Sequence, residues 1–129
     1  MIASAKGFLL IAAASGFVSV TFGAFGAHAL RGRLDDYHLR IFHTGVEYQF
    51  YHTLALFVVG MLLAVYKIHS LRWVGWAFTF GIVLFSGSLY VLALTRVKAW
   101  GAVTPIGGAA FLVGWLLLFS AVWKQMHSL

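Results

Sequence analysis

Hydrophobic residues fill four long stretches of this chain, separated by short polar segments. The stretches cover about residues 7–30, 46–66, 73–94 and 104–123. Each can cross a bilayer as a helix, since a transmembrane helix needs roughly 20 mostly apolar residues. Backbone groups in lipid must find their hydrogen-bond partners within the segment, which favours helices. The pattern predicts an all-α integral membrane protein, an antiparallel four-transmembrane-helix bundle forming a single domain over residues 1–129.

The segments that join these stretches carry helix-start signals. Between the first two, residues 31–40 form an extended polar segment. Within and just after it, Leu34, Tyr37, His38 and Ile41 recur at helical spacing with charged residues between them. This spacing predicts a short interfacial helical segment, which Asp35 or Asp36 can cap. At the start of the fourth stretch, Thr104 is expected to cap the helix and Pro105 to occupy its first position.

Small residues form a stripe along the first stretch. They recur at spacings of three and four: Ala12, Gly16, Ser19, Gly23 and Gly26. Because small side chains let a neighbouring backbone approach closely, the stripe predicts a helix-packing seam.

The second stretch begins with a polar and aromatic run, residues 43–53. At about 100° per residue, with His43 at zero, Glu47 lies near 40°, Tyr51 near 80° and His52 near 180°. Half of the helix surface is therefore polar for about three turns. Unpaired polar groups are costly in lipid, so this half must face protein, water or a ligand.

Helix direction brings further polar residues to the same side of the membrane. In an antiparallel bundle, the ends of spans one and three lie beside the beginnings of spans two and four. We therefore predict a polar intramembrane cluster of eight residues: His28, His43, Glu47, Tyr48, Tyr51, His52, Ser88 and Tyr90. Within it, His43, Tyr51 or His28 is expected to hydrogen-bond to Glu47. If that role is structural, Glu47→Leu should cost about 1–3 kcal/mol.

Composition excludes several kinds of function. The chain is 62% hydrophobic and 9% charged, and it has no Cys, which excludes disulfides, thiolate metal sites and cysteine nucleophiles. Its nine Lys and Arg give a net charge of +6 without a basic run. These cations suit anionic lipid headgroups rather than nucleic acid. They divide five against four between the two sides, which leaves the orientation open and also permits an antiparallel dimer.

The sequence offers few residues that could bind a metal or a cofactor. A di-iron carboxylate site needs several Glu residues, and Glu47 is the only one. Haem ligation by His28 and His52, or a metal site begun by His43 and Glu47, each has a simpler explanation in hydrogen bonds between or within helices. No nucleophile has a recognisable base beside it. We therefore predict no metal, no cofactor and no catalytic residue, and an enzymatic activity is disfavoured.

Four segments, residues 22–30, 44–52, 84–90 and 104–108, carry a family resemblance. They read FGAFGAHAL, TGVEYQFYH, LFSGSLY and TPIGG, and they resemble motifs of the domain-of-unknown-function 423 family of small multi-pass proteins. The resemblance implies a bacterial inner (plasma) membrane protein and brings no reaction or cofactor. Where members commonly read Leu-Thr-Gly, this chain has Leu94-Thr95-Arg96, which affects the geometry of that turn.

Three functions remain open at this point. The first is a non-enzymatic membrane adaptor or accessory subunit that packs against partner helices. The second is a small homo-oligomeric transporter or channel that uses Glu47 and His52 as proton or cation sites, since ionisable residues within membranes are often functional. The third is a haem- or quinone-associated membrane subunit.

Overall fold

The computed structural model describes the backbone of residues 2–128 and the side chains of residues 4–26 and 28–125. In chain order the elements are α1 (Ile2–Ala29), α2 (Asp36–Tyr66), α3 (Leu71–Gly81), the π-helix η1 (Ile82–Ser86), α4 (Gly87–Thr95), the 3₁₀-helix η2 (Lys98–Ala102) and α5 (Thr104–Ser128). In this part of the chain, four helical segments are long and apolar enough to cross a membrane: Ser4–Gly26, Asp36–Tyr66, Leu71–Thr95 and Lys98–Gln125. The predicted four-span helical fold is confirmed.

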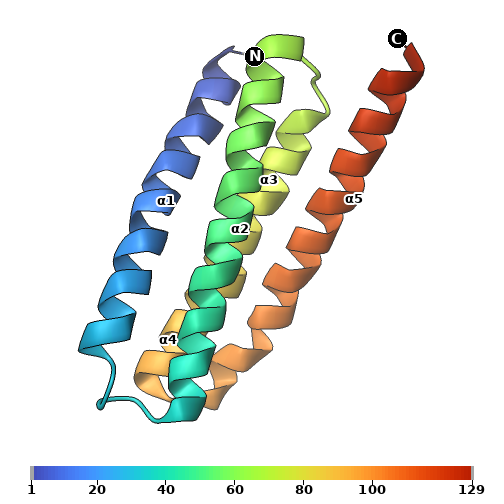
Figure 1. The fold of residues 1–129 in the computed structure, drawn as a ribbon. Coiled ribbons are helices and arrows are strands. Elements are labelled where there is room, and N and C mark those ends of the chain that lie inside the picture. Colours follow the sequence, from blue (N-terminus) through green and yellow to red (C-terminus); the bar gives the residue numbers. More distant parts are fainter. Residues whose placement is uncertain (1, 129) are drawn as a thin grey trace.

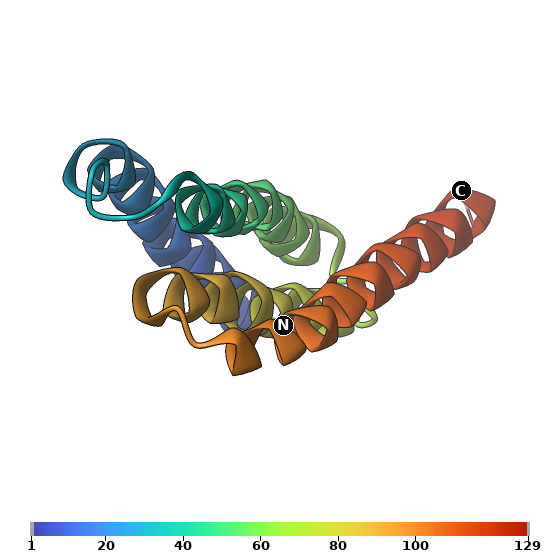
Figure 2. The ribbon, with the colours of Figure 1, turned by 90° about the horizontal axis from the view of Figure 1, so that it is seen from below.

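The spans pack in chain order. Helix α1 lies along α2, α2 packs against α3 and α4, and α5 packs against α3 and η1. Seen along the bundle, α5 crosses the third span and leans away from α2 toward its C-terminal end (Figure 2). Both chain ends lie at the same end of the bundle (Figure 1), as four spans require.

Helix α2 begins ten residues before the predicted start of the second span. Residues 36–45 continue the spanning helix, so the expected interfacial segment forms its first turns. Asp35 is the N-cap, and its carboxylate accepts a hydrogen bond from the His38 backbone N–H at 3.4 Å. This confirms the predicted cap. Thr104 does begin α5, and its hydroxyl bonds across to Ser88 on α4 at 2.6 Å.

The small-residue stripe of α1 faces α2. A Cβ on Gly16 would lie 3.6 Å from Thr53, and one on Gly23 would lie 3.5 Å from Val46. At Gly26 a Cβ would clash with the Phe42 ring at 2.7 Å. The predicted packing seam is therefore confirmed. It lies between α1 and α2 of the same chain.

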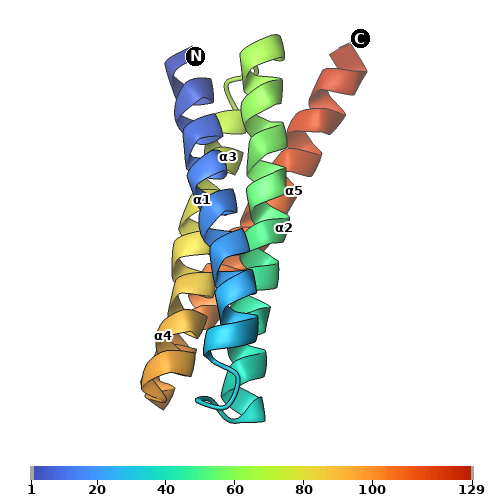
Figure 3. The same ribbon diagram turned by 60° about the vertical axis from the view of Figure 1, so that its left-hand side comes forward.

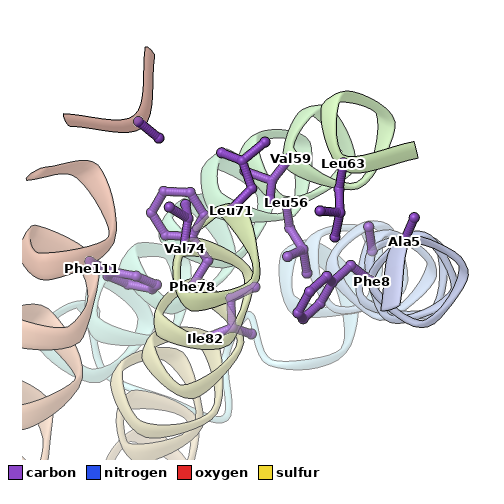
Figure 4. Close-up of a cluster of buried hydrophobic side chains, with 12 residues drawn as sticks. Ala5, Phe8, Leu56, Val59, Leu63, Leu71, Val74, Phe78, Ile82 and Phe111 are labelled. Carbon is purple, nitrogen blue, oxygen red and sulfur yellow. The ribbon is translucent and has the colours of Figure 1, made fainter. Parts of the chain in front are cut away.

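The main cluster of buried apolar side chains, drawn in Figure 4, lies between the spans in the half of the bundle nearer the chain ends. Leu56, Leu63 and Phe78 are completely enclosed there. In the other half, α5 approaches η1 so closely that a Cβ on Gly107 would overlap the backbone of Phe85. This close contact fixes the start of α5 beside the third span, where the polar residues gather.

Candidate functional site

The polar run of α2 has one buried face and one exposed face. The residues of the run that are buried toward the other spans are Gly45, Gln49, His52 and Thr53. Leu56, further along α2, is buried as well. Glu47, Tyr51 and Leu54 point away from the bundle and are exposed. The sequence placed Gln49 near 240° and Glu47 near 40° on the helix, so the two lie on opposite sides.

Gln49 joins three spans on the buried face. Its Oε1 accepts a hydrogen bond from the Tyr90 hydroxyl at 2.5 Å, and its Nε2 donates to the Ser15 Oγ at 3.0 Å. The Ser15 hydroxyl also pairs with the Thr53 hydroxyl at 2.7 Å. The carboxamide thus uses both its donor and its acceptor to tie α1, α2 and α4 together.

Two serines extend the polar contacts toward the start of α5. The Ser86 hydroxyl, in η1, donates to the Gly45 carbonyl at 2.7 Å and is fully buried. Ser88 pairs with Thr104 and also donates to the Phe85 carbonyl at 2.9 Å. These bonds connect the third span to its neighbours on both sides.

His52 is only 5% exposed and is enclosed by aromatic side chains. Its ring stacks on Phe111, with centroids 3.5 Å apart and planes 7° from parallel. The Trp115 indole N–H donates to Nε2 at 3.0 Å, and Nδ1 lies 2.8 Å from the Tyr48 carbonyl. Because Nε2 is an acceptor, the proton must sit on Nδ1 and bond to Tyr48. Both ring nitrogens of a neutral imidazole are therefore satisfied.

The eight predicted cluster residues do not form one group. His52, Ser88 and Tyr90 lie inside the bundle, while Glu47, Tyr48 and Tyr51 are exposed and His43 is half-buried. His28 is exposed on the side of α1 that faces away from α2. Among the side chains that the structure describes, none hydrogen-bonds to the Glu47 carboxylate. The expected bonds from His43, Tyr51 or His28 are therefore not formed within the chain.

The ligand pairs considered from the sequence are not brought together either. No group of three or more His, Cys, Asp or Glu residues could hold a metal ion within the described part of the chain. Gly26 faces Phe42, so His28 lies roughly 18 Å along α2 from the level of His52. With both nitrogens of His52 also bonded, the geometry does not fit a haem held by these two residues.

The predicted cluster omits Ser15, Gln49, Thr53, Ser86 and Trp115, whose side chains form hydrogen bonds between the spans. The prediction favoured ionisable side chains, and carboxamides, aliphatic hydroxyls and indoles do not titrate. A usable signal was present in the spacing of Gly45 and Gly60, which mark the face of α2 that neighbouring helices approach. Gln49 lies on that face.

Grooves on the outside of the bundle are lined mostly by apolar side chains. One of about 490 Å³ lies between α2 and α5 and includes His52, Phe111 and Trp115. Two more, of about 280 and 260 Å³, share Ile11 and run along α1 beside α3. Among the described side chains, no buried polar atom lacks a hydrogen-bond partner. The polar groups inside the bundle therefore need no ligand.

Comparison with known sequences identifies the family. Residues 22–108 match the family described as "Protein of unknown function (DUF423)". The chain belongs to this family. It is 47% identical over 119 residues to the "UPF0382 membrane protein SERP0230" of Staphylococcus epidermidis, covering 92% of this chain and 97% of that protein. It is 44% identical over 122 residues to the "UPF0382 membrane protein YwdK" of Bacillus subtilis, covering 94% and 99%. No solved structure matches this chain.

Membership confirms the resemblance seen in the four motifs. The DUF423 match covers motifs from all four spans, and the named relatives are membrane proteins of nearly the same length. These family relationships establish a membrane protein and assign no reaction to any residue of the buried network.

Proposed function

We propose that this DUF423 protein is a non-enzymatic adaptor or accessory subunit that packs against a partner membrane protein. The observation that carries the proposal is the complete pairing of polar groups inside the bundle. Because Gln49 and His52 bond to neighbouring spans and to the α2 backbone, the interior serves to hold the helices together. Interactions with other molecules then fall to the outer surface, where the grooves lie.

The groove beside α1 is the surface best shaped for a partner helix. Its lining residues on α1 recur every three or four positions: Ser4, Gly7, Ile11, Ala14 and Val18. A Cβ on Gly7 would meet no other atom within 4 Å. Small residues at a rim let another helix approach closely, and dispersion and packing hold helices together in lipid. Ser15 and Thr79 place hydroxyl groups in the lining.

The geometry gives less support to a transporter that uses Glu47 and His52. These side chains lie about 140° apart around α2, one exposed and one enclosed. An ion passing between them would have to cross the packed helix. A quinone-associated subunit is also less favoured, since the nitrogens of His52 are already bonded to Trp115 and Tyr48.

The proposed location is the bacterial inner membrane. The relatives are named as membrane proteins of Bacillus and Staphylococcus species, and four spans with short connections leave almost all of the chain at the bilayer. The cations at both ends of the bundle are placed to meet anionic headgroups.

Affinity purification from native membranes in mild detergent tests the adaptor role. Ala13 and Ala14 are neighbouring exposed residues of α1, but only Ala14 lines the groove. We expect the unmodified chain and Ala13→Phe to co-purify with a membrane protein in fixed stoichiometry, and Ala14→Phe to lose it while folding normally. The proposal fails if no such partner appears, or if the purified chain alone moves protons or cations into liposomes.

A further inference from the structure

Residues seven positions apart share the exposed face of α2. One set of positions is Arg40, Glu47, Leu54 and Met61, and a second is His43, Phe50, Phe57 and Ala64. All of them are exposed except His43, which is half-buried. A seven-residue repeat keeps one face of a helix against a parallel neighbour over many turns. The face therefore has the periodicity of an interface between two helices.

The exposed carboxylate of Glu47 indicates that the outer face of α2 packs against another protein group. Its carboxylate is exposed and has no hydrogen bond or ion pair to any described side chain. It lies seven residues after Arg40, roughly 10 Å further into the membrane-spanning part of α2. A carboxylate at such a depth is costly in lipid and usually faces another protein group.

We propose that two copies of this chain associate through parallel α2 helices, with Glu47 of each copy bonded to His43 of the other. In a parallel seam, each side chain of the first set inserts into a hole formed by four residues of the neighbouring helix. For Glu47 these residues are His43, Val46, Glu47 and Phe50 of the second copy. The two Glu47 carboxylates therefore lie side by side, and each also meets a His43 of the other copy. Two-fold symmetry then forms the Glu47–His43 contact twice.

The direction of the pair follows from the ends of α2. Arg40 and Lys67 bracket its apolar part. In an antiparallel pair centred in the bilayer, Arg40 of one copy lies level with Lys67 of the other, and Glu47 lies level with residue 60. The exposed-face side chains nearest that level are Phe57 and Met61, and neither can pair with a carboxylate. The parallel arrangement does bring the acid to a base.

Cysteine cross-linking tests the interface directly, because the chain contains no Cys. We expect Leu54→Cys and Met61→Cys each to form disulfide-linked dimers when native membranes are oxidised. Phe17→Cys on α1 and Leu116→Cys on α5 are matched controls, since both residues are exposed to lipid on other faces. No dimer at the two α2 positions, or equal dimer at the controls, overturns the proposal. Dimer at position 54 without dimer at 61 indicates an antiparallel pair and also overturns it.

Exchange of the two residues tests the Glu47–His43 pair. In the Met61→Cys background, Glu47→Leu or His43→Leu should weaken dimerisation about tenfold. The double variant His43→Glu/Glu47→His keeps the acid and the base on the same face, so it should restore dimerisation. Failure of both Leu variants to weaken the dimer, or failure of the exchange to restore it, contradicts the pairing. Ala14→Phe should leave the dimer intact, which separates this interface from the proposed adaptor groove.

Discussion

The two faces of α2 use polar residues in different ways. On the inner face, Gln49, His52 and Thr53 are buried, and each bonds to a neighbouring span or to the α2 backbone. On the outer face, Glu47 and Tyr51 are exposed, and the carboxylate has no partner among the described residues. Polar residues a few positions apart in one membrane helix therefore differ: those on the inner face bond within the chain, and those on the outer face are available for the association proposed above.

The largest contrast between the faces is expected at Leu56 and Phe57. Leu56 is 0% exposed and Phe57 is 47% exposed. Leu56→Ala leaves a cavity between spans and should lower the free energy of unfolding by about 1–3 kcal/mol, since lost packing dominates in lipid. Phe57→Ala should change it by less than about 0.5 kcal/mol. Reversible unfolding in detergent, at a dilution that keeps the chain monomeric, measures both. Similar losses at the two positions would remove the distinction between the faces.

A smaller effect is expected when His52 loses its donor on the inner face. Trp115→Phe keeps an aromatic ring but leaves Nε2 without the indole N–H. The expected cost is about 1 kcal/mol. The ¹⁵N chemical shift of His52 Nε2 should also change, while Trp73→Phe at an exposed position should leave it unaltered. An unchanged Nε2 shift in Trp115→Phe would show that the indole does not hold the imidazole.

The smallest effect concerns the start of α2, which belongs to neither face. The hydrogen bond between the Asp35 carboxylate and the His38 side chain lowers the pKa of Asp35 from the ordinary value of 3.8. A carboxyl with a lowered folded-state pKa stabilises the fold above 3.8, and this contribution is lost as pH falls through the folded-state pKa. Asp35→Asn should therefore reduce the melting temperature slightly at pH 7 and by less near pH 3. An equal reduction at both pH values would argue against the carboxylate as its cause.

The sequence was sufficient for the spans, for a cap at Asp35 or Asp36, and for the small-residue seam. Each depends on local chemistry: apolar length, the capping geometry of a carboxylate, and the spacing of Ala12, Gly16 and Gly23. These features act within one helix or on one helix surface, so they can be read before the neighbours are known.

The sequence could not show in the same way which residues of the run 43–53 are buried and which are exposed. A helix wheel gives the angles of Glu47 and Gln49 but does not show which side meets the other spans. That choice depends on where the Tyr90 and Phe111 side chains arrive from spans three and four. The π-helix Ile82–Ser86 had no local signal that we recognised either, and it sets where Ser86 and Tyr90 point. The contacts between spans therefore had to come from the structure.

Side-by-side melting of Gln49→Leu and Glu47→Leu tests the central claim most directly. The measurement uses the monomeric chain in one detergent, with the unmodified protein as reference. Gln49→Leu leaves the Tyr90 hydroxyl without its partner and removes one of the two side-chain partners of Ser15, which keeps Thr53, so its melting temperature should fall clearly. Glu47→Leu removes no bond to a described residue and should melt with the unmodified protein, in contrast to the loss expected from the sequence. A larger fall for Glu47→Leu than for Gln49→Leu would contradict the assignment of the inner face to folding and the outer face to association.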